Sequence, residues 1–535
     1  MYIKIITQYF RRPVHMRLSL FPKNIRGSRR FYHDLPFINL YKDVTGETIS
    51  EYFALKLQKK NPKIKNLSRE QLQSTLQVLS KFGINAEDAC LNPHIFCMNL
   101  ISMDNYGEIL RECNFTVILP KHIIRYHTLV KSRTISQLKK DGLLKDNLNL
   151  EELLYNYFHD WPREYIHFLN FPDSNTNILT VRLSILERYL QWKFSITSEE
   201  FKNYCKNYLP LKHRPMCDIQ EALNIAQNDI KFDTESIRRN GFIISSDPVN
   251  TKLILENVDS LGGLDIRTAI KIEPAILKNH YQALLDIKNI LEQYNISNEA
   301  QRSCFKVYCM RPETVRARLE HLTNLKEYQV LSSNPRVLFL VVHEKKMMTR
   351  LSKIQAARKQ CFSLNHLVAS SKVFNTYINS FGNKVCGRDL AILISSSLQT
   401  KGISNKSVLK ELKRHKYWLY TALNVIGENI KLLKKQFSDD VIFNNCQLLL
   451  YPAFELEQYV EILLKIRDGG TSTELSREID TMYRNLNCRT LTDNQILSLV
   501  LYEIEKKYHF SGDGVWNKSD GKGARSYQTK ANVVN

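Results

Sequence analysis

The hydrophobic positions of residues 311–358 recur at helical spacing on both sides of a short apolar segment that follows a proline. This spacing predicts two helices, each with one apolar face, separated by that segment. Such a unit cannot bury its own apolar surface, so the pattern predicts similar units stacked on either side. The apolar positions are Val315, Leu319 and Leu322 in the first helix, residues 337–340 in the segment after Pro335, and Met347, Leu351 and Ile354 in the second helix.

Prolines followed by apolar residues recur along much of the chain. Pro93 and Pro120 are 27 residues apart, and the later series Pro248, Pro274, Pro312 and Pro335 has spacings of 26, 38 and 23 residues. Proline at a helix start removes no needed hydrogen-bond donor, so we interpret each as a boundary between helices. Chance explains any single copy, but a series of about seven favours a repeat array. A late copy ends at Pro452.

The pattern weakens between residues 129 and 240, where Trp161-Pro162 and Leu209-Pro210 are candidate degenerate copies. With 18 glycines and 15 prolines in 535 residues, the chain has about half the usual share of each. Few turn-forming residues and no sustained valine or isoleucine alternation predict an all-α fold. We expect a polar segment at 34–70, a helical repeat array at 71–505, and a disordered polar tail at 506–535.

The net charge of +22 is concentrated in two places. Residues 1–33 contain eight Lys or Arg residues and no acid, and residues 301–435 contain 25 Lys or Arg residues against seven Asp or Glu residues, a net charge of +18. The remaining residues sum to −4. This asymmetry is typical of a targeting segment combined with a polyanion-binding surface, here the basic block 301–435.

The first 33 residues have the composition of a mitochondrial transit peptide, because they are Arg-rich and acid-free with interspersed apolar residues. Arg29-Arg30 places the expected cleavage near Tyr32 or His33. A disordered basic tail is the alternative. No apolar run approaches the ~18 residues of a membrane span, so we expect a soluble protein of the mitochondrial matrix.

The sequence contains no recognisable enzyme signature. Eleven cysteines occur without a C-x-x-C pair, and no phosphate-binding G-x-x-x-x-G-K-[ST] motif is present. His122 and His127 are five residues apart, which places them on different faces of a helix and makes a poor metal pair. We therefore expect a non-enzymatic protein without a metal or cofactor.

The repeated order of leucine-rich helix, second helix and Pro-x-apolar-apolar segment resembles the mitochondrial transcription termination factor (mTERF) family, and its long insect members most. The best copies are Phe82-Gly83-Ile84 with Asn92-Pro93-His94-Ile95-Phe96, Ser333-Asn334-Pro335-Arg336-Val337-Leu338, and Phe437-Ser438 with Cys446-Gln447-Leu448-Leu449-Leu450-Tyr451. The resemblance covers roughly residues 70–465. It implies a curved all-α solenoid of two-helix-plus-3₁₀ repeats that binds duplex DNA in mitochondrial transcription. Some relatives act instead on ribosomal RNA in ribosome assembly.

Two rows of basic residues within block 301–435 are candidates for phosphate binding. Lys406, Lys410 and Lys413 are spaced as one helix face, with Tyr417 next in the row, and Lys346, Arg350 and Lys353 form a similar row. Like charges at this spacing destabilise an isolated helix by a few tenths of a kcal/mol each, and phosphates would compensate them. A solvated lysine face is the alternative.

The complete set of predicted nucleic-acid-binding residues includes the flanking cations of the same block. Glu320 is an alternative partner for Arg316, whereas Arg336 follows Pro335 at a turn with outward backbone N–H groups. For Trp418 we expect packing in the core. The set is Arg316, Arg318, Arg336, Lys346, Arg350, Lys353, Arg358, Lys359, Lys401, Lys406, Lys410, Lys413, Arg414 and Tyr417.

Three functions are compatible with these features. The first is a duplex-DNA-binding regulator of mitochondrial transcription, located in the nucleoid. The second is an RNA-binding factor for mitochondrial ribosome assembly. The third is a helical-repeat adaptor whose basic block binds an acidic protein, such as part of the transcription machinery or another mTERF protein.

Overall fold

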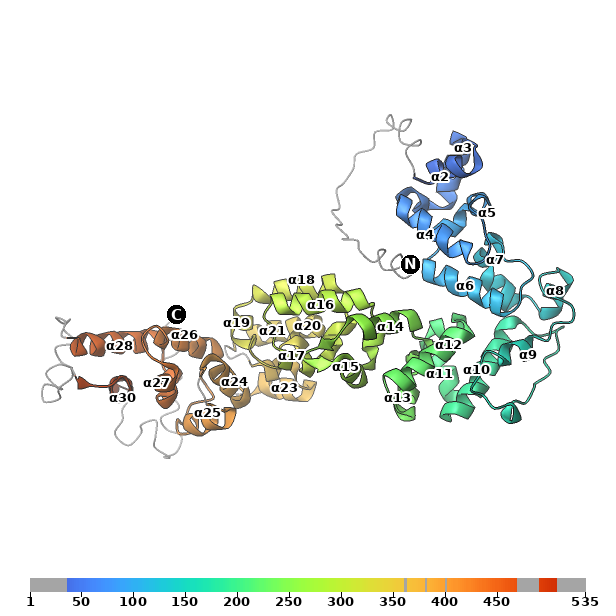
Figure 1. The fold of residues 1–535 in the computed structure, drawn as a ribbon. Helices are drawn as coiled ribbons and strands as arrows, with labels where there is room; N and C mark the ends of the chain where they lie inside the picture. Colours follow the sequence, from blue (N-terminus) through green and yellow to red (C-terminus); the bar gives the residue numbers. More distant parts are fainter. Residues whose placement is uncertain (1–35, 360–362, 381–382, 400–401, 469–489, 508–535) are drawn as a thin grey trace. The chain divides into compact units, whose positions relative to one another are not determined.

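The computed structural model describes residues 36–359, 363–380, 383–399, 402–468 and 490–507 (Figure 1). The predicted leader 1–33 and residues 508–535 of the predicted tail lie outside this range. The chain forms two compact units. Unit 1 comprises residues 1–258 and 270–282, and unit 2 comprises residues 259–269 and 283–535.

A repeated order of elements confirms the predicted all-α repeat fold. A longer helix is followed by a shorter helix and then by a 3₁₀ turn, as in α4 (Arg69–Ser80), α5 (Ala86–Leu91) and η2 (Pro93–Cys97). Strands within the described residues are limited to the antiparallel pair β1 (Ser260–Leu261) and β2 (Leu264–Asp265). The two residues between them are glycines with φ of +57° and +74°, the backbone conformation that such a tight hairpin requires.

Unit 1 contains the N-terminal repeats. Its remaining elements are α2 (Pro36–Thr45), α3 (Glu51–Lys60), η1 (Pro62–Asn66), α6 (Leu100–Glu112), α7 (Pro120–Ile124), π-helix η3 (Thr128–Ser132), α8 (Ile135–Lys140), α9 (Leu150–Tyr155), η4 (Arg163–Tyr165), α10 (Ile178–Phe194), α11 (Ser198–Asn207), η5 (Leu209–His213), α12 (Met216–Asn224), π-helix η6 (Ile225–Asp229), α13 (Thr234–Arg239), η7 (Gly241–Ser245), α14 (Pro248–Asn257) and η8 (Pro274–Lys278). Helix α15 (Ile266–Ile272) is divided between the units.

Unit 2 contains the basic block and the C-terminal repeats. Its helices are α16 (Tyr281–Gln293, from residue 283 on), α17 (Asn298–Ser303), η9 (Phe305–Cys309), α18 (Pro312–Thr323), α19 (Lys326–Leu331), α20 (Leu338–Val342), α21 (Glu344–Ala356), α22 (Leu364–Val368), α23 (Ser371–Asn379), α24 (Gly387–Ser397), α25 (Asn405–Leu412), α26 (Leu423–Leu433), α27 (Asp439–Asn444), η10 (Cys446–Leu450), α28 (Ala453–Arg467) and α30 (Asp493–Lys507). None of the helices in the described segments is long and apolar enough to cross a bilayer.

The 3₁₀ turns supply the apolar contacts between successive helix pairs. In η2, Ile95 and Phe96 are buried, and in η8, Ile276 and Leu277 are buried. Each such side chain stabilises the fold by about 1.5–3 kcal/mol when it leaves water. Proline stands at or next to the start of several of these turns, where its fixed φ suits the geometry.

Two complete repeats occupy the stretch in which the sequence pattern weakens. They are α10–α11–η5 and α12–α13–η7. Turn η7 begins with Gly241 instead of proline, and a Cβ at that position would lie 2.5 Å from the Tyr204 ring. Close packing of Tyr204 therefore requires the glycine, and the repeat persists without the proline that would have marked it. Residues 36–66, expected only as a polar segment, also form helices α2 and α3 and turn η1.

A buried ion pair joins three helices of unit 1. The guanidinium of Arg182 on α10 lies 2.7 Å from the carboxylate of Glu112 on α6, and both side chains are almost fully buried. Glu112 also accepts a hydrogen bond from the backbone N–H of Cys217 on α12, 3.1 Å away, and Arg182 donates to the Arg214 carbonyl at 2.9 Å. Each charge is stabilised mainly by the other, because neither has access to water.

Removing one member of this pair should destabilise unit 1. We expect Arg182→Met to lower the free energy of unfolding by about 3–5 kcal/mol, because it leaves the Glu112 carboxylate buried without its counter-charge. Urea unfolding followed by the fluorescence of Trp161 and Trp192, both in unit 1, measures this loss. The double variant Arg182→Met/Glu112→Leu should recover much of it. Equal losses in both variants would mean that shape, not charge, dominates the site.

Candidate nucleic-acid interface

Helix α25 presents three exposed lysines from a buried apolar base. Ser404 caps the helix by accepting a hydrogen bond from the Ser407 N–H, and Val408 and Leu412 anchor the helix in the core of unit 2. Lys406, Lys410 and Lys413 are exposed. No salt bridge to these three lysines occurs in the part of the chain that the structure describes.

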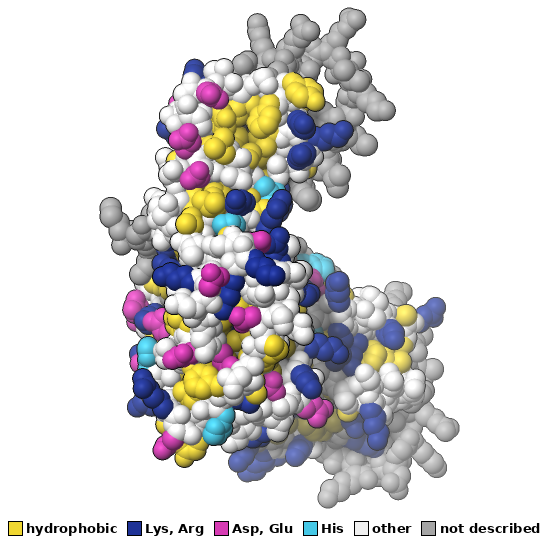
Figure 2. Space-filling view, turned by 90° about the vertical axis from the view of Figure 1, so that its right-hand side faces the viewer, with side chains coloured by type: hydrophobic (Ala, Val, Ile, Leu, Met, Phe, Trp, Pro, Cys, Tyr) yellow, Lys and Arg dark blue, Asp and Glu magenta, His cyan; other side chains and the backbone are white. Residues whose placement is uncertain are grey.

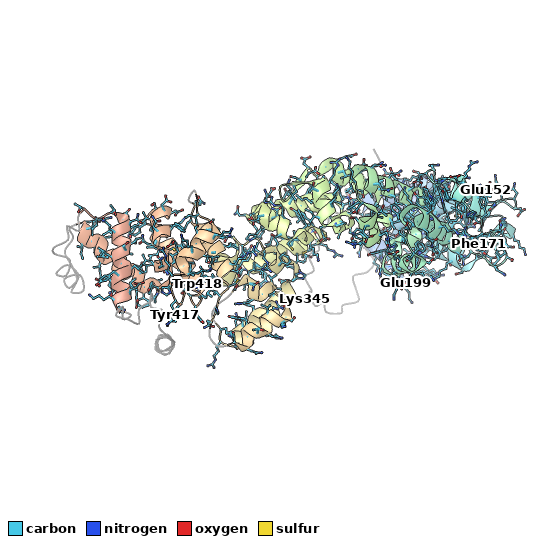
Figure 3. The ribbon with its side chains drawn as sticks, turned by 90° about the horizontal axis from the view of Figure 1, so that it is seen from below. Glu152, Phe171, Glu199, Lys345, Tyr417 and Trp418 are labelled. Atoms are coloured by element: carbon cyan, nitrogen blue, oxygen red, sulfur yellow. The ribbon has the colours of Figure 1, made fainter. Side chains whose placement is uncertain are left out.

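The aromatic residues after α25 do not continue its helical row. The helix ends at Leu412, and residues 413–420 form turns, so Tyr417 is placed by turn geometry and not by helical spacing. Its ring centroid lies 6.4 Å from that of Tyr420. Trp418 covers Gly387, where a Cβ would lie 2.6 Å from the indole, so this side chain packs against the core as expected. Figure 3 shows both residues on unit 2.

Helix α21 separates its basic residues into two kinds. Lys346 and Lys353 are exposed, but Arg350 is only 5% exposed. Its guanidinium Nη1 donates to the carbonyls of Leu367 (2.6 Å), Ala369 (2.7 Å) and His366 (3.3 Å) at the end of α22. These carbonyls lack partners within their own helix, so Arg350 acts as their cap. It follows Met347 by three positions and precedes Ile354 by four, which places it in the buried row.

Two other predicted ligands are also engaged in contacts that hold helices together. Lys359 is nearly buried, donates to the Ser380 carbonyl at 2.7 Å, and lies 4.7 Å from the centre of the Tyr377 ring. Arg318 pairs with Glu344 at 3.1 Å and donates to the Val341 carbonyl at 2.7 Å. The geometry therefore assigns both side chains to contacts within unit 2.

Arg336 lies beside a buried polar network. Its backbone N–H donates to the Asn334 side chain at 3.0 Å, and Asn334 donates in turn to the Asp389 carboxylate at 3.2 Å. The other oxygen of Asp389 accepts from the hydroxyl of Ser363 and from the backbone N–H of Asn365. Since this backbone N–H of Arg336 already has a partner, the half-buried guanidinium, 3.4 Å from Asn365, is what remains for a ligand.

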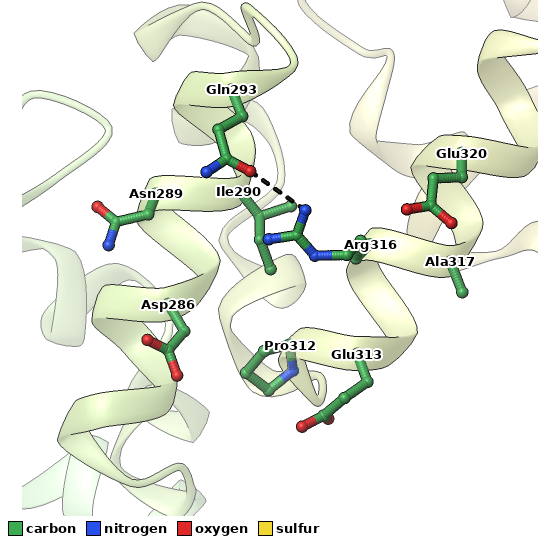
Figure 4. A pocket seen from close by; sticks show the side chains of 9 residues that line it. All are labelled: Asp286, Asn289, Ile290, Gln293, Pro312, Glu313, Arg316, Ala317 and Glu320. Atoms are coloured by element: carbon green, nitrogen blue, oxygen red, sulfur yellow. Dashed lines mark hydrogen bonds between the residues drawn. The ribbon is translucent and has the colours of Figure 1, made fainter. Parts of the chain in front are cut away.

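Arg316 is exposed at a shallow pocket between α16 and α18 (Figure 4). It donates to Gln293 at 3.2 Å instead of turning back to Glu320 on its own helix. The pocket also carries Asp286, Glu313 and Glu320, so the local charge is acidic. Arg316 is consequently a weaker candidate for phosphate binding than the lysines of α21 and α25.

The last three predicted residues are Arg358, Arg414 and Lys401. Arg358 is exposed with a left-handed backbone (φ +52°), and Arg414 is exposed and pairs with Glu411 at 2.7 Å. Lys401 lies outside the described residues. Among the predicted residues, the exposed cations without an acidic partner in the described part of the chain are therefore Arg316, Lys346, Lys353, Arg358, Lys406, Lys410 and Lys413.

Unit 1 has a different surface. Figure 2 shows one of its faces, on which basic and acidic side chains are interspersed. Several basic side chains of unit 1 form salt bridges, such as Lys252–Glu221 and Arg238–Glu200. Exposed lysines without a salt bridge among the described residues occur in both units, on α21 and α25 of unit 2 and at Lys56, Lys59 and Lys60 on α3 of unit 1.

Comparison with known proteins identifies a relative. The chain is 27% identical over 460 residues to the mitochondrial transcription termination factor 5 of Drosophila melanogaster, which covers 86% of this chain and 80% of the relative. No family model matches the chain. No solved structure matches it either.

Substitution by methionine should lower the folding free energy much more at Arg350 than at Lys353. Arg350→Met leaves the carbonyls at the end of α22 without a donor and should cost about 2–4 kcal/mol of folding free energy. Lys353→Met, on the exposed side of the same helix, should change it by less than about 0.5 kcal/mol. Urea unfolding monitored by circular dichroism compares the two. Similar effects at both positions would contradict the separation of roles.

Two buried histidines should make unit 2 sensitive to acid. Burial lowers the pKa of His366 to about 4 and that of His415 to about 4. An unfolded histidine, with a pKa of about 6.5, binds a proton that the folded one rejects, so stability should fall as the pH decreases from about 6.5 towards 4. We expect a loss of about 2 kcal/mol per histidine between pH 7 and pH 5.

The variant His415→Gln tests this assignment, because glutamine does not titrate in this range. Its unfolding free energy, measured in urea at pH 7 and pH 5, should depend less on pH than that of the unaltered chain by about 2 kcal/mol. An unchanged pH dependence would show that His415 is already protonated in the fold.

Proposed function

We propose that the chain is a member of the mitochondrial transcription termination factor family and that it regulates mitochondrial transcription by binding duplex DNA through the exposed cations of unit 2. Its relative is a mitochondrial transcription termination factor. The observation that supports this proposal most is the row Lys406, Lys410 and Lys413 on α25 and its C-cap, which has no salt bridge among the described residues.

Phosphate binding would relieve the repulsion between the like charges of this row. Neighbouring like charges repel, and carboxylates normally relieve that repulsion. Duplex DNA carries about one charge per 1.7 Å of its axis, and lysines that neutralise phosphates release condensed counterions. The free energy of that release gives strong, salt-dependent binding without base contacts.

The proposed contacts form two groups along unit 2. Lys346, Lys353 and Arg358 belong to α21 and the turn after it, and Lys406, Lys410 and Lys413 belong to α25 and its C-terminal cap. Arg350, Lys359 and Arg318 act indirectly, because they hold the helices that carry these residues. Arg316, Arg336 and Arg414 would add further phosphate contacts, and Lys401, which lies outside the described residues, stays a predicted contact.

The proposed site of action is the mitochondrial matrix, at the nucleoid. The acid-free, Arg-rich residues 1–33 have the composition of a mitochondrial address. Binding and control of transcription need no chemistry from the protein, so we propose a non-enzymatic regulator.

Ribosomal RNA is the second candidate ligand. Tyr420 is 49% exposed, lies close to Tyr417, and is accompanied by Lys416, whose amine is 5.7 Å from the Tyr417 ring centre. Unpaired bases stack on exposed aromatic rings next to cations, a mode suited to single-stranded RNA. This cluster favours a role in ribosome assembly if structured RNA binds more tightly than duplex DNA.

Charge reversal of the α25 row tests the proposal directly. We expect Lys406→Glu/Lys410→Glu/Lys413→Glu to weaken binding of mitochondrial duplex DNA at least tenfold, because each lysine would lose a phosphate contact. The slope of log affinity against log salt should fall by about 2–3 units. Fluorescence anisotropy at several salt concentrations gives both values, and parallel titrations with structured ribosomal RNA rank the two ligands.

Helix α3 of unit 1 offers a matched control. Lys56, Lys59 and Lys60 are exposed, so Lys56→Glu/Lys59→Glu/Lys60→Glu changes the net charge by the same amount within unit 1. Its effect should be several-fold smaller. Equal losses from both triple variants, or binding that does not depend on salt, would contradict a localised interface.

A further inference from the structure

The segment between α9 and α10 of unit 1 exposes apolar side chains in an otherwise polar surface. Tyr165 is 56% exposed, Phe168 is 47% exposed and Leu169 is 41% exposed. They lie within residues 163–171, which we call the aromatic loop. Isolated exposed apolar residues are ordinary, but three within five positions of one loop are typical of an interaction site.

The aromatic loop is held in place by buried partners. The carboxylate of Glu151, only 5% exposed, accepts hydrogen bonds from the backbone N–H groups of Leu169 (2.6 Å) and Asn170 (3.0 Å). Asn170 adopts the left-handed conformation (φ +49°) that turns the chain there. The Phe168 ring meets Tyr155 edge to face with centroids 5.4 Å apart.

An aromatic base below the loop adds rigidity. Trp161 is buried, and its ring lies 5.0 Å from Tyr155 and 6.3 Å from Trp192. Because the loop is fixed before any partner arrives, little conformational entropy would be lost on binding. The exposed side chains are therefore presented for contact and are not the by-product of a loose segment.

The chain segment that contains the loop has a net charge opposite in sign to that of the whole protein. Residues 146–200 contain nine Asp or Glu residues and four Lys or Arg residues, a net charge of −5 in a chain of +22. Asp160 and Asp173 are paired with Lys193 and Lys139. Within residues 146–200, the exposed acids with no salt bridge among the described residues are Asp146, Glu152, Glu164 and Glu199, and Figure 3 shows Glu152, Phe171 and Glu199 on unit 1.

We propose that the aromatic loop and its acidic surroundings form a docking surface for a second protein, which presents an apolar segment flanked by Lys or Arg residues. The aromatic side chains would supply the contact energy, as such residues do at interface centres. The carboxylates would steer a basic partner towards the loop. The same carboxylates repel phosphate, so this surface is unsuited to nucleic acid. The chain would thus join a protein through unit 1 while unit 2 serves its proposed nucleic-acid site.

Site-specific photo-crosslinking tests this surface. The full-length chain, with p-benzoylphenylalanine in place of Phe168, is irradiated in isolated mitochondria, and the crosslinked peptide is identified by mass spectrometry. We expect one protein other than this chain, attached through a segment that contains apolar and Lys or Arg residues. Adducts only to nucleic acid, only to a second copy of the chain, or to no macromolecule would overturn the proposal.

The affinity of that purified protein for the full-length chain and its variants then measures how much the apolar side chains and the carboxylates each contribute to binding. Tyr165→Ser/Phe168→Ser/Leu169→Ser should weaken binding at least tenfold. Glu152→Lys/Glu164→Lys/Glu199→Lys, which alters only exposed side chains, should weaken it similarly and reduce its dependence on salt. Unchanged affinity in either variant would contradict the proposal.

Two controls separate this surface from other effects. Leu91→Ser removes another exposed apolar side chain of unit 1, on α5, and should leave the affinity unchanged. Both loop variants should also retain the duplex DNA affinity of the unaltered chain. If the α25 triple variant loses or keeps its DNA affinity, that result bears only on the function proposed for unit 2, because the partner-binding measurement does not depend on it.

Discussion

Burial of a short apolar turn between successive helix pairs is the constraint on which the rest of this structure depends. The pairs are too short to form independent bundles, and each leaves one apolar side open. Turns such as η2 and η8 fill that side with Ile95, Phe96, Ile276 and Leu277. Because the same contact recurs, surface residues at corresponding places in successive repeats can vary without loss of the fold. That freedom allows one stretch of the chain to become strongly basic.

In the basic block, the number of cations in the sequence is larger than the number that is exposed and free of internal contacts. Arginine donates several hydrogen bonds from a planar group, and in unit 2 Arg350 and Arg318 use this capacity on main-chain carbonyls at helix ends. Lysines on the outer faces of α21 and α25 have no comparable role in packing. The surface proposed to bind nucleic acid is therefore made mainly of lysines, and the helices that carry these lysines are held by arginines that contact main-chain carbonyls.

The sequence predicted the fold class, because it follows from long-range regularities that survive local variation, whereas the position of the nucleic-acid-binding surface stays a prediction. Hydrophobic spacing identified α18 and α21 with their buried faces. It failed at η7, where Gly241 replaces the expected proline and close packing against Tyr204 preserves the turn. At Arg350, spacing alone could not distinguish the edge of a buried row from an exposed face. The sequence predicted Tyr417 in a helical row because no glycine or proline between Leu412 and Tyr417 indicates that α25 ends there.

The anchoring of Arg350 has an evolutionary consequence. A lysine there would keep the charge, but its ammonium nitrogen would lie about one bond closer to the backbone than the Nη1 atom from which the guanidinium reaches three carbonyls. Selection at this position would act on the integrity of the repeat and would be indifferent to the target. Among divergent homologues, arginine should persist at this place even where the preferred ligand has changed, while the lysines of α25 drift with it.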